Sequence, residues 1–484
     1  MRINLAGFNI DHDVLKQLLT DSSPRAGDAL TPETLSAAYA RISRDPAPVD
    51  ELRRKAAEDV AAARASNAQI VFGYGHASVA EHAVFNFDLI DVSRLAIEAI
   101  EHSRLCSYTE KSQRYVIFDP EKDEFVIPAE ITEVGLAREF KYYVRQTHEQ
   151  YHYILGRIKD QERPQGGSAP EDARYVSTLA VTGQLGMTCN ARNLEMLIRR
   201  LMAHPLDEVR TVGQTLYVRA KDVAPSLLKY VTPEPLRLAQ TGKVQEALRL
   251  QCAGLLSVPI ERVSLLAATG NVENGQSGGD HIILAALVHQ VSRVPFDMCF
   301  ASIARLSPEQ RKGLMLNVLS AMDVYSAAPR CFEMCDLTFE LIVSASCFAQ
   351  LKRHRMMTLL PQAYDPSLGY TIPASITQDE PALERFKAVM RTADAFYRKL
   401  ARVCNESLAE YVLTQAHRRR VLVKLNAREA YAFSRLREDK HAQWEIREIA
   451  QQVMALARRV MPLTMALACG KDAFEEWRKQ VFSC

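Results

Sequence analysis

Apolar and polar residues alternate in two segments of the chain, residues 81–89 and residues 333–341. A period of two is typical of a strand with one buried face. Each segment leads into a predicted helix, from Ser93 to about Arg104 in the first half and from Ser344 to about Arg355 in the second. The same strand-then-helix pattern therefore occurs twice.

Other segments repeat in the same order. Each pair shares its local pattern: 2–7 with 262–267 as strands, 37–44 with 286–293 as helices, and 189–194 with 425–430 and 207–210 with 444–447 as helix starts. Repeats kept in one order indicate tandem duplication of a structural unit of roughly 220 residues. We predict an α+β fold in two copies, each with a central mixed sheet flanked by helices and a helical part. The predicted boundaries are 1–232 for the first copy, 233–259 for a helical linker and 260–484 for the second copy.

Composition excludes several classes of protein. The 60 Lys plus Arg nearly balance the 58 Asp plus Glu, so a general attraction to nucleic acid is not expected. The amino terminus lacks a signal-peptide pattern and no apolar run is long enough to span a membrane, which predicts a soluble cytoplasmic protein. The ten cysteines form no Cys-x-x-Cys pair, so we expect reduced thiols and no metal site. The glycine-rich stretches 161–170 and 271–279 contain no nucleotide-binding loop motif and are expected to be loops.

The basic triplet Arg353-His354-Arg355 follows an apolar run, residues 341–349. Two arginines can bind phosphate through forked, charge-assisted hydrogen bonds, and a histidine between them can titrate near neutral pH. The alternative is that the triplet is the solvated end of a helix, placed favourably against the helix dipole. The triplet alone leaves both interpretations open.

Three motifs together carry a resemblance to a known family. They are Gly75-His76-Ala77-Ser78-Val79-Ala80-Glu81-His82, Glu110-Lys111-Ser112-Gln113-Arg114-Tyr115 and Arg353-His354-Arg355-Met356-Met357-Thr358. They resemble the flavin-dependent thymidylate synthases, whose signature is Arg-His-Arg-x-x-Ser, here with Thr in place of Ser. The segments 426–428, 436–437 and 441–447 resemble the carboxy-terminal pattern of the same family.

The two copies depart from the family pattern in complementary ways. Where the signature belongs, the first copy has His102-Ser103-Arg104 and so lacks the double arginine. The second copy has residues 360–365 where Glu-x-Ser-x-Arg belongs, with Asp365 at the position of the arginine. Neither copy is complete alone.

The resemblance implies sites formed between subunits of a homotetramer, so the retained residues are compared as one set. The first copy keeps Glu110, Ser112, Arg114 and Arg174, and Glu410 stands at the second-copy position of Arg174. The second copy keeps Gln350, Arg353 and Arg437, whereas the first has Ala99 for Gln350, and Arg200 for Arg437 only if a gap is allowed. We infer one composite site per pair of copies, in a homodimer that forms a pseudo-tetramer.

The resemblance also implies the ligands. It implies dUMP as substrate, methylenetetrahydrofolate as one-carbon donor, FAD as cofactor and NADPH as reductant. The implied substrate-binding residues are Glu110, Ser112, Arg114, Arg174, Gln350, Arg353 and Arg437, and the implied FAD-binding residues are His76, Ser78, Arg353, His354, Arg355, Asn426, Arg428 and His441. Arg437 and Arg353 are assigned as catalytic, because a guanidinium beside a ring carbonyl would stabilise negative charge that develops on the uracil.

Two other functions remain open. The altered segment 359–370 is compatible with a related flavin enzyme that uses another pyrimidine nucleotide or another one-carbon donor. Decay of both copies would instead leave a catalytically inactive nucleotide-binding protein. Asn190 and Arg192 are equally well explained as residues kept only to brace the fold of the first copy.

Overall fold

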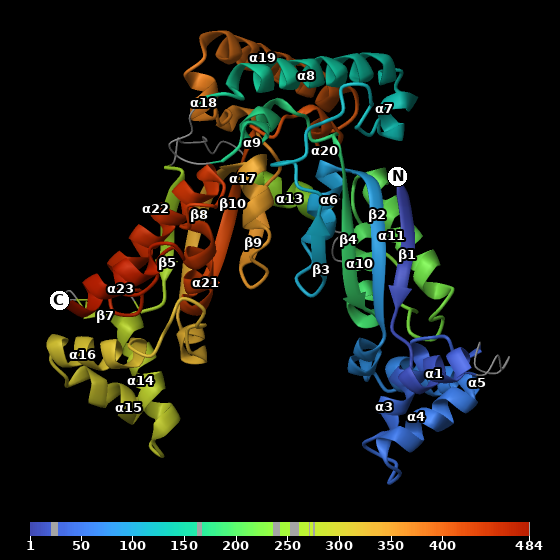
Figure 1. Ribbon diagram of the computed structural model, residues 1–484, viewed down its shortest axis with the longest axis vertical. Helices are drawn as coiled ribbons and strands as arrows, with labels where there is room; N and C mark the ends of the chain where they lie inside the picture. Colours follow the sequence, from blue (N-terminus) through green and yellow to red (C-terminus); the bar gives the residue numbers. More distant parts are fainter. Residues whose placement is uncertain are drawn as a thin grey trace. The chain divides into compact units, whose positions relative to one another are not determined.

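The computed structural model describes residues 1–20, 28–161, 167–235, 243–251, 261–270, 272–273 and 276–483 (Figure 1). The chain divides into two compact units, each built from three stretches of sequence. Unit 1 comprises Met1–His148, Thr178–Leu256 and Ala395–Val412, and unit 2 comprises Glu149–Ser177, Ser257–Asp394 and Leu413–Cys484. These units differ from the predicted sequence copies, whose boundaries at 232 and 260 stay a prediction.

Unit 1 contains a four-stranded sheet in the order β1-β2-β4-β3. Its strands are β1 (Arg2–Phe8), β2 (Val84–Ser93), β3 (Ser107–Glu110) and β4 (Thr182–Asn190). Every strand pair is antiparallel. Phe85, Phe87 and Leu89 of β2 are buried, as their alternation predicts.

Unit 2 repeats this sheet in the order β5-β8-β10-β9. Its strands are β5 (Val263–Ala268), β8 (Asp336–Ser344), β9 (Thr358–Pro361) and β10 (Arg418–Asn426), with a separate ribbon of β6 (Val272–Glu273) and β7 (Gln276–Ser277). The shared strand order confirms the predicted α+β fold in two copies. The predicted mixed sheet is wrong in one respect, because all pairs in both sheets are antiparallel and no parallel crossover joins them.

Helices complete each unit. Those of unit 1 are α1 (His12–Thr20), α3 (Glu33–Arg41), α4 (Val49–Glu58), α5 (Val60–Asn67), η1 (Ala68–Gly73), η2 (Ala77–His82), α6 (Arg94–Glu101), α7 (Ala129–Glu133), α10 (Ala191–Met202), α11 (Asp207–Lys221), α13 (Lys243–Leu250), α20 (Glu406–Ala409) and η6 (Glu410–Val412). Those of unit 2 are α9 (Ala169–Ala173), η3 (Arg174–Val176), α14 (Gly278–Val291), α15 (Phe296–Ala304), α16 (Pro308–Leu319), η4 (Arg330–Met334), α17 (Ala345–Leu351), η5 (Pro366–Leu368), α18 (Ala374–Thr377), α21 (Ala427–Arg437), α22 (Trp444–Val460) and α23 (Phe474–Ser483). The division between the units falls inside the two longest helices, α8 (Ala137–Ile158) and α19 (Glu380–Val403). No helix in the described ranges is long and apolar enough to cross a membrane.

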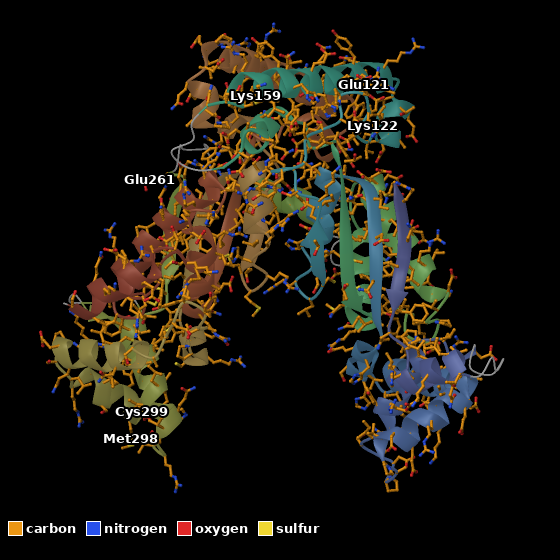
Figure 2. The ribbon with its side chains drawn as sticks, in the orientation of Figure 1. Glu121, Lys122, Lys159, Glu261, Met298 and Cys299 are labelled. Carbon is orange, nitrogen blue, oxygen red and sulfur yellow. The ribbon has the colours of Figure 1, made fainter. Side chains whose placement is uncertain are left out.

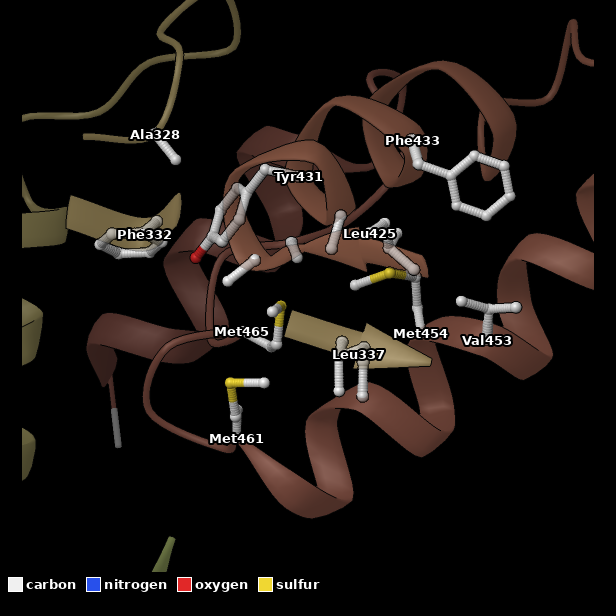
Figure 3. Packing of buried hydrophobic residues seen from close by; sticks show 14 of the residues in the cluster. Ala328, Phe332, Leu337, Leu425, Tyr431, Phe433, Val453, Met454, Met461 and Met465 are labelled. Atoms are coloured by element: carbon white, nitrogen blue, oxygen red, sulfur yellow. The ribbon is translucent and has the colours of Figure 1, made fainter. Parts of the chain in front are cut away.

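The core of unit 2 lies between one face of its sheet and the helices that cover it (Figure 3). Leu337 of β8 and Leu425 of β10 belong to the same buried cluster as Met454, Met461 and Met465, which lie in and after α22. Unbranched methionine side chains fill such an irregular interface well. This packing fixes the two strands whose ends lead to the signature and to the Asn-x-Arg motif.

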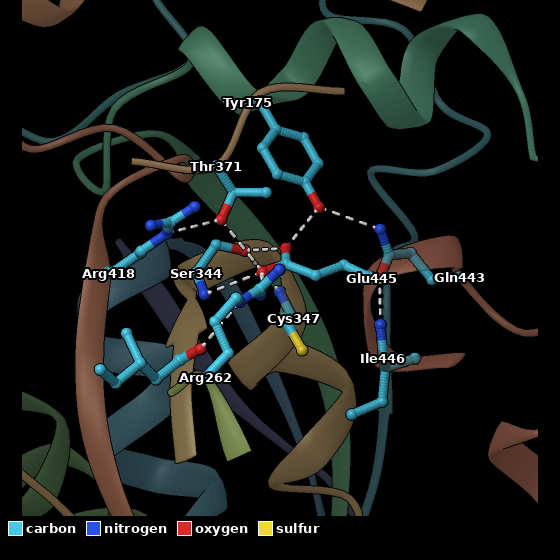
Figure 4. Close-up of polar contacts among 10 residues, drawn as sticks. Tyr175, Arg262, Ser344, Cys347, Thr371, Arg418, Gln443, Glu445 and Ile446 are labelled. Atoms are coloured by element: carbon cyan, nitrogen blue, oxygen red, sulfur yellow. Dashed lines mark hydrogen bonds and ion pairs between the residues drawn. The ribbon is translucent and has the colours of Figure 1, made fainter. Parts of the chain in front are cut away.

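The two compact units exchange short segments of sequence. Tyr175, which belongs to the first sequence copy, lies in unit 2 and donates a hydrogen bond to Glu445 Oε2 at 2.8 Å (Figure 4). Glu445 is fully buried and also accepts hydrogen bonds from Thr371, Ser344 and Arg262. One carboxylate thus joins four separate elements of unit 2.

Unit 1 has the reciprocal arrangement. Tyr411, from the second sequence copy, donates to Glu208 Oε2 at 2.6 Å, and Ser93 donates to the same carboxylate through its amide (2.7 Å) and its hydroxyl (2.6 Å). Burial, followed by the neighbouring carboxylate, raises the pKa of both tyrosines, so each hydroxyl keeps the proton that it donates. Tyr175 and Tyr411 therefore take equivalent places in opposite units.

Some predicted boundaries need correction. The helix predicted to reach Arg355 ends at Leu351, so the basic triplet lies in the turns that follow it. The helix predicted to reach Arg104 likewise ends at Glu101, and each helix is followed by turns that lead into a short strand, β3 or β9. Of the predicted linker, Lys243–Leu250 is helical, while residues 236–242 and 252–260 lie outside the described residues.

Candidate functional site in the second unit

His354 is the buried centre of the signature, with only 5% of its surface exposed. Its Nε2 accepts a hydrogen bond from Arg437 Nε at 2.8 Å, and its Nδ1 lies 3.1 Å from Glu429 Oε1. An arginine can only donate, so Nε2 carries no proton and Nδ1 donates to the carboxylate. Glu429 thereby fixes the tautomer of His354, and His354 in turn orients Arg437.

The charge state of His354 follows from its surroundings. Burial lowers the pKa of His354, the hydrogen bond to Glu429 opposes this shift, and the charge of Arg437 lowers it further. The imidazole is therefore neutral at neutral pH. Protonation would convert Nε2 into a donor and remove the acceptor that Arg437 uses.

Acid should consequently weaken this part of the fold. Because the pKa of folded His354 lies below its ordinary value, the unfolded chain takes up the proton first, and the unfolding free energy falls as pH drops through about 6.5. We expect the difference in unfolding free energy between the native chain and His354→Gln to shrink between pH about 8 and about 5.5, measured by urea denaturation. A difference that stays constant over this pH range would contradict the assignment, and His441→Gln serves as a control because His441 is exposed.

Arg437 ends α21 and reaches back to the last turn of α17. Its Nη1 donates to Gln350 Oε1 at 3.2 Å and its Nη2 to the Gln350 carbonyl at 3.1 Å. The structure thus brings together Gln350, His354 and Arg437, three residues that the sequence assigned to one site. Arg353 and Arg355, on either side of His354, are exposed.

A hollow of about 420 Å³ lies beside this cluster. Its lining includes the predicted cofactor-binding residues Asn426 and Arg428, together with Glu429, Met356 and Leu436. Met356 and Leu436 are 69% and 57% exposed, so the hollow offers apolar surface as well as charge. Met356 directly follows the basic triplet, so the hollow adjoins the signature.

Asn426 and Arg428 also have structural roles. Asn426 caps α21 by accepting from the Glu429 amide at 2.8 Å, and Arg428 pairs with Glu333 at 2.7 Å. Unit 1 repeats both contacts, since Asn190 caps α10 and Arg192 pairs with Glu81. The bracing interpretation given for the first copy therefore applies to the Asn-x-Arg motif in both units.

Arg174 is the one first-copy residue of the predicted set that the structure places in unit 2. It lies in η3, directly before Tyr175, and is 4% exposed. It thus shares a unit with Arg353 and Arg437. His441 is in the same unit, exposed, with its amide bonded to Asp439 Oδ1 at 2.8 Å.

The remaining predicted residues lie in unit 1. Glu110 ends β3 and is paired with Arg94, and both side chains are at most 5% exposed. Ser112 Oγ accepts from the Arg114 amide at 3.3 Å, and the Arg114 guanidinium lies 5.5 Å from the centre of the Tyr115 ring. The other two members are exposed residues beside and in η2: His76 and Ser78.

The altered segment 359–370 of the second copy has a structural role. Tyr364 is 1% exposed and its ring lies 4.0 Å from the Arg419 guanidinium. Asp365, at the position of the family arginine, caps η5 by accepting from the Ser367 amide at 2.8 Å. In place of anion-binding groups, this segment supplies packing and a helix cap.

Unit 1 keeps one remnant of the Arg437 arrangement. Arg200 of α10 donates to the carbonyls of Ala99 and Ile100 at 2.8 and 3.1 Å. Ala99 stands where Gln350 stands in unit 2, so Arg200 corresponds to Arg437, which supports the alignment with a gap.

Sequence reasoning missed Glu429, the partner of His354. Glu429 stands one residue after Arg428, and the first copy has Asn193 at that position. The difference follows the presence of His354 in one copy and Ser103 in the other. The two positions therefore change together between the copies, and this joint change is the sequence signal that could have identified Glu429.

A larger hollow of about 810 Å³ lies in unit 1, away from every predicted site residue. Its lining is rich in carboxylates, and Figure 2 labels two of its residues, Glu121 and Lys122. Hydrogen bonds from Arg145 and Lys141 hold the pKa of Asp123 at about 2, which shows that this carboxylate already has cationic partners. No group of His, Cys, Asp or Glu that could hold a metal occurs among the described residues.

Comparison with known proteins defines the family. The model of the thymidylate synthase complementing protein family matches residues 28–226 and 286–463, and the chain belongs to this family. UPF0159 protein Ta1429 of Thermoplasma acidophilum is 23% identical over 448 residues, covering 81% of this chain and 86% of its own length. The flavin-dependent thymidylate synthase of Clostridium tetani is 30% identical over 212 residues, covering 42% of this chain and 83% of its own length.

Among solved structures, a UMP/dUMP methylase, PolB from Streptomyces cacaoi bound with 5-Br dUMP, matches with a TM-score of 0.33 and 16% identity. The match covers 44% of this chain and 94% of that chain. Two relatives of different extent thus match, one along most of the chain and one along less than half of it.

Proposed function

We propose that the chain is a flavin-dependent thymidylate synthase, which methylates dUMP to dTMP with methylenetetrahydrofolate as one-carbon donor, FAD as cofactor and NADPH as reductant. The observation that carries the proposal is the cluster of Gln350, His354 and Arg437 beside the hollow in unit 2. Membership of the family, and relatives named as flavin-dependent thymidylate synthases, support it.

The residues around the hollow in unit 2 fit FAD chemically. Arg428 lines the hollow and supplies donors suited to a diphosphate, as would the exposed Arg353 and Arg355, which come shortly before the lining residue Met356. Met356 and Leu436 supply apolar surface suited to a ring system. His354 is bonded to Glu429, which lines the hollow, and His76 and Ser78 would complete the set. FAD, when bound and reduced by NADPH, would supply hydride chemistry.

For the substrate, we assign the phosphate of dUMP to Arg114, Arg174 and Ser112. Hydrogen bonds to charged groups contribute about 1.5–3 kcal/mol each. We assign Arg437 to a uracil carbonyl, with Arg353 beside it, because a fixed guanidinium stabilises negative charge developing on the ring. The bonds from Arg437 to His354 and Gln350 pre-organise that guanidinium before substrate binds.

We further propose one composite site per pair of copies, formed in a homodimer. Unit 1 would contribute Glu110, Ser112 and Arg114, and unit 2 would contribute the signature and Arg437. The rebuilt segment around Asp365 and the absence of a double arginine at 102–104 support this division, since each unit lacks what the other keeps.

The test is direct. Purified full-length chain should carry bound FAD, visible as a yellow flavin spectrum, and should form dTMP from dUMP only when methylenetetrahydrofolate and NADPH are present. Methylation without the folate would favour a related flavin enzyme with another donor. A chain without bound FAD and without any thermal shift from dUMP would be an inactive homologue. Folate-independent methylation or this absence of binding would each contradict the proposal.

A further inference from the structure

Arg94 is a buried arginine that the proposed function does not use. It is the first residue of α6, it is 3% exposed, and its Nη1 pairs with Glu110. Within the described part of the chain, its Nε and Nη2 are buried and have no hydrogen-bond partner. Buried donors of a charged group are rarely left unmatched, because water cannot replace the missing acceptor.

The second unit shows that the fold itself does not need this arginine. Ser93 and Ser344 cap equivalent helices and bond to equivalent carboxylates, so Ala345 takes the place of Arg94 in unit 2. The partner changes as well, since Pro361 stands where Glu110 stands in the equivalent strand. Arginine and carboxylate therefore occur together in one unit and are both replaced in the other.

The charges around Arg94 limit what it can bind. Burial works against its charge, but the carboxylates of Glu110, Glu98 and Glu101 outweigh this and raise its pKa. Three carboxylates thus act on this one guanidinium. A phosphate dianion placed beside these carboxylates would be repelled by them, whereas an uncharged oxygen would accept hydrogen bonds from Arg94 without that cost.

From the unmatched donors, their burial and the three carboxylates that act on the guanidinium, we infer that Arg94 binds an uncharged oxygen of the nucleoside part of the substrate, a sugar hydroxyl or a ring carbonyl, beside Glu110. This inference rests on the proposed function for the identity of the substrate. It assigns Arg94 as a binding residue for the nucleoside, separate from the arginines assigned to the phosphate.

Binding to the full FAD-loaded chain tests the inference, by titration calorimetry with dUMP and with 2′-deoxyuridine. Arg94→Met alone would leave Glu110 buried without its cation, so the comparison is Glu110→Gln against Arg94→Met/Glu110→Gln. The double variant should bind both ligands at least about 100-fold more weakly than Glu110→Gln, since two charge-assisted bonds are lost. Arg145→Met, which removes an exposed ion pair with Asp123, should leave both affinities unchanged.

Equal affinity of Glu110→Gln and the double variant would overturn the inference, because Arg94 would then serve only to neutralise Glu110. Loss of dUMP affinity with unchanged 2′-deoxyuridine affinity would also overturn it, because the contact would then be to the phosphate. A 3′-deoxy analogue of dUMP distinguishes a contact to the 3′-hydroxyl from a contact to a ring carbonyl. With this analogue, the difference in affinity between the two variants disappears if Arg94 binds the hydroxyl and persists if it binds the carbonyl. If the double variant binds more weakly but the native chain makes no dTMP, the proposed function is contradicted and the inference is supported. If the native chain makes dTMP but the double variant binds as tightly as Glu110→Gln, only the inference is contradicted.

Discussion

Arg114→Ala in unit 1 and Arg353→Ala in unit 2 should each abolish dTMP formation by the full-length chain. The composite site takes the phosphate contacts of Arg114 and Ser112 from one unit and the signature from the other, so either change damages every working site. We expect each variant to lose about 100-fold or more in kcat/KM, since each removes charge-assisted contacts made in a desolvated site. Steady-state assays of dTMP formation, with flavin content measured in parallel, give the values.

The matched control is Arg104→Ala, which removes the last basic residue of the degenerate signature in the first copy. Its activity should stay near that of the native chain, because the composite site does not use that position. If each copy formed its own site, Arg114→Ala and Arg353→Ala would each leave about half of the activity, and combining them would be needed to remove the rest. That pattern is incompatible with the proposal.

Glu445→Ala should produce the largest loss of stability. Its buried carboxylate accepts from Tyr175, Thr371, Ser344 and Arg262, and the change leaves the Arg262 charge and the buried hydroxyls without their acceptor. Breaking a buried ion pair by removing one partner costs about 3–5 kcal/mol. We expect a loss of this size in the unfolding free energy, measured by urea denaturation.

Glu208→Ala in unit 1 is the matched comparison. Glu208 accepts from Tyr411 and Ser93, and its described hydrogen bonds include none from an arginine. Its replacement should therefore cost less than that of Glu445, about 1–3 kcal/mol for the lost acceptor. Equal losses for the two variants would show that the Arg262 contact contributes nothing.

The repeat could be predicted from sequence because it depends on local patterns. The alternation around Phe85 and Phe339 defines equivalent central strands, and Asn190 and Asn426 mark equivalent helix starts. These features follow from side-chain periodicity and capping, which neighbouring residues determine. They appear in the structure where the sequence places them.

The exchange of segments could not be predicted in this way. The same local pattern occurs in Arg174-Tyr175-Val176 and Glu410-Tyr411-Val412. Each unit offers one buried tyrosine a carboxylate partner, Glu445 in unit 2 and Glu208 in unit 1. Local sequence therefore does not decide which unit each segment joins. The choice depends on contacts such as that of Trp444 Nε1 with Asp172 at 2.9 Å, which only the folded chain brings together.

The candidate site likewise contains some residues that sequence could identify and others that it could not. The motifs identified Gln350, His354 and Arg437, and the structure joins them by hydrogen bonds. Arg94 and Glu429 carry no motif, because their roles arise from burial beside a residue distant in sequence. Only the comparison of equivalent positions in the two units makes them visible.

The number of dUMP molecules bound per chain tests the composite site most directly. Calorimetric titration of the FAD-loaded full-length chain with dUMP gives this number independently of turnover. We expect one bound dUMP per chain, because two copies together form one intact site. Two equivalent dUMP molecules per chain would contradict it, since each copy would then hold a complete site of its own.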